Sequence, residues 1–326
     1  MQALQLSPAF DSPSDSPCEV PPPAVEHWQQ WQTLEANLAT LLLEPYRCPT
    51  FITDIATCAA TLLSLTARDP DVAIFHMVHT TPEKMNRYGV MHAMHTGMLL
   101  ALIGLRKDWG DARNISAIKA GLTMNISITA LQVELAQQAG PLTPEQKVAI
   151  DAHPLGSWKM LHDLGVTDEE WLIAVAQHHE RPDGKGYPQG LTEVHPLADA
   201  IRTCDVFGAK MSPRAGRARM PTPRAAAEIF RQRSAGYFGA TIIRELGLYP
   251  PGCLVELCTG EQAMVVQRHR DPHTPDVVVL SDTQGHALAR PYRCQTTRTG
   301  GHLIIGAAPD QSWGALFGPE DILSLK

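Results

Sequence analysis

Two adjacent histidines, His178 and His179, close an apolar stretch of the chain and are followed by a charged loop. Imidazole nitrogens at a helix end can bind a metal ion, and a nearby carboxylate can orient the ring. The loop adds two glycines, which let the backbone approach a ligand closely, and two cations suited to phosphate oxygens: Gly184, Gly186, Arg181 and Lys185. The histidine pair alone favours an ordinary helix C-terminus, where the helix dipole stabilises His, followed by a turn. The complete string of residues 178–188, His-His-Glu-Arg-Pro-Asp-Gly-Lys-Gly-Tyr-Pro, favours a functional site.

This string resembles the signature of the HD-GYP family, a bacterial branch of the HD superfamily of metal-dependent phosphohydrolases. The resemblance extends from about Tyr88 to about Leu248, roughly half of the chain. It implies an all-helical domain with a metal cluster inside the helical bundle. It also implies hydrolysis of the phosphodiester bonds of cyclic di-GMP.

Further positions match the family pattern one at a time. His92 follows Tyr88 by four positions and precedes the pair Ile103-Gly104, and His153 opens a His-Pro-Leu-Gly string. The resemblance implies five metal ligands: His92, His153, His178, His179 and Asp205. It also implies that substrate is bound by six residues: Arg181, Lys185, Gly186, Tyr187, Arg214 and Arg217. For the last two, a solvated basic loop is the competing interpretation.

The chain departs from the family at its namesake His-Asp pair, where it has Met124 and Asn125. Ser127 and Ile128 likewise replace the Gly and Lys of the family pattern. In HD-type sites the Asp bridges two metal ions, which together stabilise the attacking and leaving oxygens of an in-line displacement. Asn125 offers only a neutral amide, and the soft thioether of Met124 suits hard Mn or Fe(II) ions poorly. No catalytic pair is therefore intact.

The remaining ligands fall into two groups in the family geometry. His153, His178 and His179 form a three-histidine set that could hold one Fe, Mn or Zn ion with open coordination positions. His92 and Asp205 are too few for a second ion unless His95 assists. The ligand count leaves two alternatives open, a single divalent ion or an empty site whose histidines are hydrogen-bonded in a polar core.

The Met124-Asn125 pair favours a degenerate HD-GYP protein of cyclic di-GMP signalling, with little or no phosphodiesterase activity. Such a protein would act as a nucleotide sensor or as an interaction module, with diguanylate cyclases among its expected partners. The alternative is an active phosphodiesterase with a mononuclear or rearranged metal site. A third hypothesis is a divergent phosphohydrolase that acts on another nucleotide.

The apolar spacing predicts a mainly α protein, an HD-type helical bundle with a small C-terminal β module. The expected divisions are a disordered tail over 1–25, a helical region over 26–87, the HD-GYP-like domain over 88–248, the β module over 249–308 and a C-terminal tail over 309–326. Expected helices within the HD-like region span residues 91–105, 117–137, 144–164, 168–179, 195–210 and 222–233.

Composition excludes several classes of protein. The net charge of −7 disfavours a general DNA or RNA binder, which needs excess cations. No secretory signal is visible, and the longest apolar run, Gly97 to Leu105, is much shorter than the roughly 20 residues of a membrane helix. The 7 cysteines are odd in number and contain no CxxC pair, so free thiols in the cytoplasm are expected.

Overall fold

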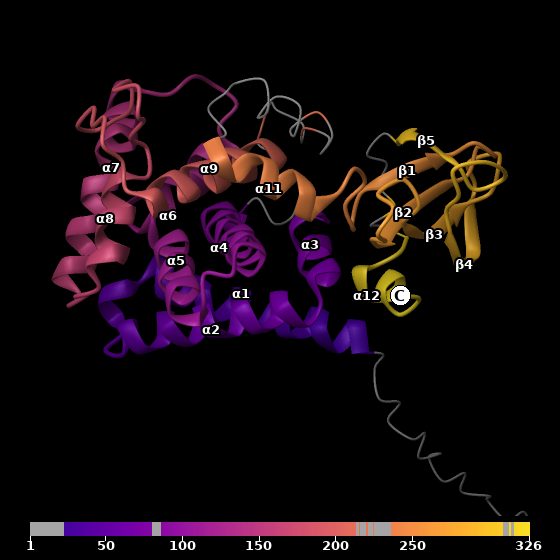
Figure 1. Cartoon of the computed structure of the whole chain (residues 1–326), viewed down its shortest axis with the longest axis horizontal. Coiled ribbons are helices and arrows are strands. Elements are labelled where there is room, and N and C mark those ends of the chain that lie inside the picture. The colour runs from indigo at the N-terminus through magenta and orange to yellow at the C-terminus, as the bar shows by residue number, and fades with distance from the viewer. Residues whose placement is uncertain are drawn as a thin grey trace, which may run out of the picture.

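The fold consists of a helical bundle joined through one helix, α11, to a five-stranded sheet (Figure 1). The structure is a computed structural model that describes residues 23–79, 86–212, 215, 220, 224, 236–308, 313 and 316–326. The fold class expected from the sequence, mainly α with a small C-terminal β module, is confirmed.

The helices are α1 Pro23–Leu43, η1 Pro45–Arg47, α2 Phe51–Arg68, α3 Pro70–Val78, α4 Tyr88–Lys107, α5 Asp111–Thr123, η3 Ile126–Ile128, α6 Thr129–Gln137, α7 Pro144–Asp163, α8 Glu169–Gln177, α9 Pro196–Met211, α11 Gly236–Leu246 and α12 Pro319–Leu323.

The N-terminal helices α1 and α2 form one side of the bundle (Figure 1). The helix-spaced residues Trp28, Trp31, Leu34 and Leu38 are all buried on one stripe of α1, which faces the core. A short 3-10 turn beginning at Pro45 separates α1 from α2. Residues 1–22, which cover most of the expected N-terminal tail, lie outside the described residues.

Helix α4 runs through the middle of the bundle, where it contacts α2, α5 and α9. By length and hydropathy it could span a membrane, but 94% of its most apolar stretch is buried inside the fold. Core helices of globular proteins that are surrounded by other helices have this all-round apolar character. Helix α4 is therefore the central core helix of this bundle.

The single helix expected over residues 117–137 is wrong, because the chain breaks at 124–128 between α5 and α6. The carbonyl of Asn125 accepts hydrogen bonds from the amide of Ile128 (2.9 Å) and the hydroxyl of Thr129 (3.1 Å). Ile126, Ile128 and Thr129 are β-branched and lose side-chain freedom in a helix. The apolar spacing continues across this break, which is why periodicity alone predicts one helix.

A polar clamp fixes α8 against α5. Asp168 caps α8 by accepting a hydrogen bond from the amide of Trp171, and it also accepts one from the ammonium of Lys119 at 2.9 Å. Burial alone would raise the pKa of Asp168, but the hydrogen bonds from Lys119, Ser116 and Trp171 hold it below its usual range. The buried indole N–H of Trp171 donates to the hydroxyl of Thr123 at 2.8 Å. These bonds set the position from which α8 presents its C-terminal end.

The β module is an antiparallel sheet with strand order β4-β3-β2-β1-β5. Its strands are β1 Leu254–Leu257, β2 Gln262–Gln267, β3 Asp276–Ser281, β4 Ala287–Gln295 and β5 Ile304–Ala307. Successive side chains of β3 alternate between the two faces. Val278 and Leu280 join the main core of the helical part, whereas Val277 and Val279 form a separate apolar cluster. The sheet is thus packed on both faces.

The expected C-terminal tail contains helix α12, which contacts α1. Its residues Ile322 and Leu323 are buried, and the Lys326 ammonium pairs with the carboxylate of Asp69. Apolar burial and this ion pair together explain why the segment is held against the body of the protein.

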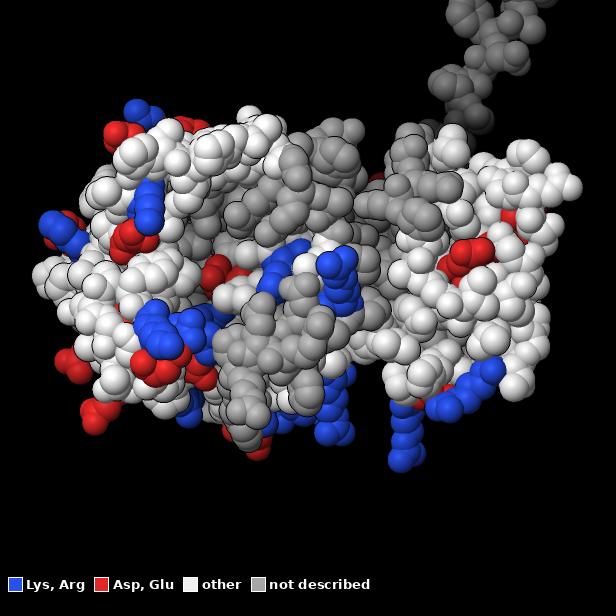
Figure 2. Space-filling view, turned by 90° about the horizontal axis from the view of Figure 1, so that it is seen from above, with Lys and Arg blue, Asp and Glu red and all other residues white. Residues whose placement is uncertain are grey.

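The described surface carries mixed charge. On the face in Figure 2, basic side chains are scattered and several lie beside acidic ones, so the described residues there form no continuous basic band. A basic stripe or patch is the electrostatic footprint of a nucleic-acid-binding surface.

The Trp171–Thr123 bond generates a stability prediction. Thr123→Val preserves the shape of the side chain but leaves the buried indole N–H of Trp171 without its acceptor, and we expect a loss of about 1–3 kcal/mol in the free energy of unfolding. Thr57→Val is the matched control, because Thr57 makes the same hydroxyl bond to the carbonyl four residues earlier but is exposed. Equal losses in urea denaturation of the two variants would show that the Trp171 bond contributes nothing.

Candidate metal centre

His153 is held in one orientation by a proline. Pro154 lies inside α7 and has no N–H to donate to the carbonyl of Ile150, four residues earlier. The Nδ1 of His153 takes this carbonyl instead, at 2.5 Å. A carbonyl can only accept, so Nδ1 carries the proton and the Nε2 of the neutral ring presents a lone pair.

His178 is oriented in the same way by the end of a helix. The last carbonyls of a helix have no partners within the helix. One of them, the carbonyl of Val175 in α8, accepts a hydrogen bond from the Nδ1 of His178 at 2.7 Å. Its Nε2 therefore also presents a lone pair. Since α7 and α8 pack side by side, the two Nε2 atoms lie 3.0 Å apart.

His179 completes a group of three. Its ring centroid lies 4.2 Å from that of His178 and 4.9 Å from that of His153. One ligand nitrogen from each of the three rings falls within 4.8 Å of the others. Two nitrogens bound to one ion at about 2.1 Å, at angles of about 90–110°, lie about 3.0–3.4 Å apart. The His153–His178 separation meets that condition.

Burial keeps these three rings neutral. Desolvation, followed by the charge of His178, lowers the pKa of His153 from 6.5 to about 3. Desolvation also lowers the pKa of His178 and His179. Neutral imidazole is the form that binds a metal ion. At neutral pH no proton lies between the Nε2 atoms of His153 and His178, so two lone pairs face each other.

His92 and Asp205 form a separate pair. His92 lies on α4 and Asp205 on α9, and His92 Nε2 is 2.7 Å from Asp205 Oδ1. Burial alone would raise the pKa of Asp205, but the hydrogen bond and charge of His92 hold it below its usual range. The carboxylate is thus ionised and close enough to act electrostatically on the three-histidine group.

The loop after the histidines is anchored by Glu180, a residue to which the sequence analysis gave no role. Its fully buried carboxylate accepts the backbone amides of Gln189 (2.7 Å) and Leu191 (2.9 Å). Gly186 lies so close to this anchor that an added Cβ would stand 2.5 Å from Glu180 Cα. Tyr187 then stacks on His179 with ring centroids 4.5 Å apart. No local sequence pattern marks Glu180 as this anchor, because its amide partners lie 9 and 11 residues further along the chain.

Comparison with known proteins agrees with this geometry. The model of the HD domain family matches residues 74–242, which is more than half of the chain. The chain belongs to the HD domain family. The resemblance expected from the sequence is confirmed.

Curated relatives of this HD domain protein are cyclic dinucleotide phosphodiesterases. Cyclic di-GMP phosphodiesterase PA4108 of Pseudomonas aeruginosa is 28% identical over 70% of this chain and 56% of its own length. The 3'3'-cGAMP-specific phosphodiesterase 3 of Vibrio cholerae is 29% identical over 43% of this chain and 31% of its own length. This chain thus spans about half, or less, of these relatives.

A solved structure shares the fold. The HD-GYP-type protein Bd1817 of Bdellovibrio bacteriovorus superposes with a TM-score of 0.56 at 14% sequence identity, over 70% of this chain and 73% of that one. HD domains are metal-dependent, and the donor set of three neutral imidazoles fits a divalent ion. His153, His178 and His179 would hold it.

Met124 and Asn125, which the sequence resemblance places at the His-Asp positions, offer no charged ligand. Met124 is fully buried and belongs to the apolar core. Asn125 is 6% exposed, and its Oδ1 has no hydrogen-bond partner within the described part of the chain. A buried amide oxygen without a hydrogen-bond partner costs free energy, because it loses its bonds to water and gains none within the protein. The backbone just beyond is tied to α7, because the hydroxyl of Ser127 donates to the carbonyl of His153 at 3.1 Å.

The other expected residues are distributed as follows. His95 is buried on α4, and its ring lies 6.3 Å from that of His76 on α3 rather than in the three-histidine group. Arg181 is paired with the carboxylate of Asp183 through two bonds of 3.0 and 2.6 Å, while Lys185 is exposed. Arg214 and Arg217 lie outside the described residues.

The close approach at Gly186 predicts a loss of stability on substitution. In Gly186→Ala the new Cβ would stand 2.4 Å from Arg181 N, and because the obstructing atoms are backbone we expect a loss of about 1–3 kcal/mol in the free energy of unfolding. Gly140→Ala is the control, because a Cβ at Gly140 has no neighbour within 4 Å. Urea denaturation in which both variants match the wild type would contradict this account of the loop.

The lowered histidine pKa values predict metal binding that resists acid. Three imidazoles with the ordinary pKa of about 6.5 would weaken a metal complex by ~1000-fold between about pH 7.5 and 5.5, because protons displace the ion. Burial lowers the pKa of His153, His178 and His179, so we expect the dissociation constant for Zn to rise much less than this. Competition titrations with a chromophoric chelator measure this, and a thousandfold rise would refute it.

Proposed function

We propose that this chain is a degenerate HD-GYP protein of cyclic dinucleotide signalling. It holds one divalent ion on His153, His178 and His179, binds a cyclic dinucleotide, and hydrolyses it slowly or not at all. The observation that carries the proposal is the buried, neutral amide of Asn125, which by the sequence resemblance corresponds to the metal-bridging aspartate of the family. The ligand class, a cyclic dinucleotide, is proposed because the relatives act on cyclic di-GMP or 3'3'-cGAMP.

A second ion has too few ligands in this arrangement. His92 and Asp205 are already bonded to each other at 2.7 Å, and no carboxylate stands at residue 125 to join them to the three-histidine group. Two ions held together stabilise both the attacking and the leaving oxygens of a displacement. A single ion without the bridging carboxylate lacks the contribution of the second ion, so we expect slower hydrolysis.

Ligand binding depends on a different set of residues, and these are intact. Glu180 and Gly186 shape the loop, Tyr187 stacks on His179, and Lys185 extends into solvent where a phosphate can reach it. Arg181 is neutralised by Asp183 and contributes less charge than the sequence indicates. The exposed loop is also the surface through which a signalling protein such as a diguanylate cyclase would dock.

The alternative is an active phosphodiesterase with a mononuclear site. One observation favours it: three ligands leave open coordination positions, and the charge of Asp205 acts on the pKa of all three histidines. Asp205 would then orient a substrate group in place of the missing bridge.

Restoring the missing pair tests the proposal. Met124→His with Asn125→Asp returns a charged ligand, and we expect cyclic di-GMP hydrolysis with added Mn or Fe(II) to rise by about 100-fold or more over the wild type. Adding His178→Ala to the double variant is the control, because it removes a ligand of the retained ion and should abolish the gain.

Two results would contradict the proposal. If the wild type hydrolyses cyclic di-GMP readily, and as fast as the double variant does, the alternative of an active phosphodiesterase is correct. Calorimetry that detects no binding of cyclic di-GMP to the wild type at high micromolar ligand would remove the sensor role.

A further inference from the structure

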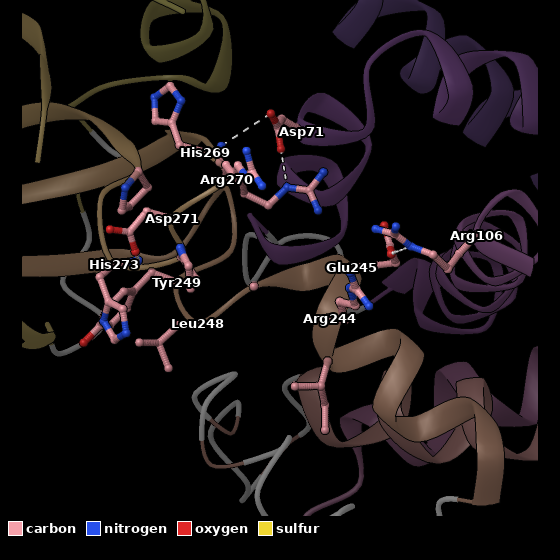
Figure 3. Close-up of a pocket in the computed structure, with 15 residues that line it drawn as sticks. Asp71, Arg106, Arg244, Glu245, Leu248, Tyr249, His269, Arg270, Asp271 and His273 are labelled. Atoms are coloured by element: carbon pink, nitrogen blue, oxygen red, sulfur yellow. Dashed lines mark hydrogen bonds and ion pairs between the residues drawn. The ribbon is translucent and has the colours of Figure 1, made fainter.

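A large cavity lies where the helical part meets the β module. Its volume is about 990 Å³, and none of the histidines of the metal centre lines it. Figure 3 shows its walls: Asp71 and Arg106 from α3 and α4, Arg244 from α11, and the loop between β2 and β3. Cavities of roughly 300–1000 Å³ are of the size that holds small organic ligands.

Most charges at this cavity are already neutralised by neighbours. Arg268 pairs with Asp71 at 2.5 Å, and Arg106 pairs with Glu245 (Figure 3). Asp271 is engaged by Arg298, which does not line the cavity, at 2.6 Å. The three carboxylates in the wall therefore have cationic partners.

Two guanidinium groups remain available. Arg244 and Arg270 line the cavity and are exposed, and neither has a carboxylate partner among the residues that the structure describes. They come from different walls, since Arg244 belongs to α11 and Arg270 to the loop after β2 (Figure 3). In a chain of net charge −7, two unpaired arginines facing one cavity form a local site for an anion.

The remaining wall suits an organic group attached to that anion. Leu248 and Ile243 supply apolar surface, and the half-buried residue Tyr249 also lines the cavity. A planar guanidinium matches the geometry of phosphate oxygens and binds them through two parallel hydrogen bonds.

We propose that this cavity binds a small phosphorylated ligand, with Arg244 and Arg270 holding its phosphate groups. The site joins elements that are distant in sequence, α11 on one side and the β2–β3 loop on the other, so its ligand stabilises their contact. Helix α11 also packs against α4 and α9, which carry His92 and Asp205. The site is thus connected to the metal centre through one helix, while its existence does not depend on the proposed function.

Calorimetry on the full chain tests this proposal with three probes: inorganic pyrophosphate, GMP and GTP. We expect at least one probe to bind saturably with a dissociation constant below about 1 mM, and more weakly as salt is raised. Arg244→Gln with Arg270→Gln should weaken that binding by about tenfold or more. Arg290→Gln is the matched control, because Arg290 is an exposed arginine of β4 outside the cavity, and it should leave binding within about twofold.

The probes separate the two sources of phosphate. Pyrophosphate that binds as tightly as GTP identifies the phosphate group alone as the ligand. Tighter nucleotide binding that is lost in Tyr249→Leu identifies a nucleotide. No saturable binding of any probe at about 5 mM overturns the proposal, as does binding that the double variant leaves unchanged or that Arg290→Gln weakens equally.

Discussion

The contact between the Nε2 atoms of His153 and His178, 3.0 Å apart inside the bundle, is the interaction on which the proposed metal centre depends. Both rings donate their only proton to a backbone carbonyl, one freed by Pro154 and the other by the end of α8. Burial excludes a second proton by lowering both pKa values. Two opposed lone pairs repel each other unless a cation lies between them, so the backbone itself prepares a metal site.

The same electrostatics are our reason for proposing one ion rather than two. Two divalent ions about 4 Å apart repel by about 17 kcal/mol at an effective dielectric constant of 20, and negative ligands shared between them must offset this. Asp205 is one such carboxylate, but it is bonded to His92, and Asn125 supplies no second charge. The Oδ1 of Asn125, which has no hydrogen-bond partner among the described residues, stands where the proposed function expects the lost carboxylate. In the proposed function, the loss of this one charge leaves ion binding in place but slows hydrolysis.

Much of the site could be predicted from local sequence. The paired histidines, the His-Pro string around His153 and the Gly-Lys-Gly-Tyr loop are short motifs, and their local geometry follows from proline and helix-end effects that act over four residues. The helix break at residues 124–128 could not, because the apolar spacing continues through it and tertiary bonds such as Ser127 to His153 decide the backbone there. The burial of α12 and the anchoring role of Glu180 also could not be predicted, because both depend on contacts with residues that are not adjacent in the sequence.

The cavity at the β module is the feature that the sequence predicts least. Asp71 and Arg268 are separated by almost two hundred residues and meet only because β2 packs against α3. Which arginines remain unpaired depends on such contacts, so Arg244 and Arg270 carry no signal in the sequence alone. Pairing in the folded state, rather than composition, determines where this acidic protein offers positive charge.

The measurement that tests the central claim most directly is the metal content of protein purified without chelator, determined by mass spectrometry of the intact native protein. Our account predicts one divalent ion per chain, lost in His178→Ala and retained in Asn125→Leu, because the ion is held by the three histidines and not by residue 125. Two ions per chain in the wild type, or loss of the metal in Asn125→Leu, would contradict it. So would a wild type that holds no metal.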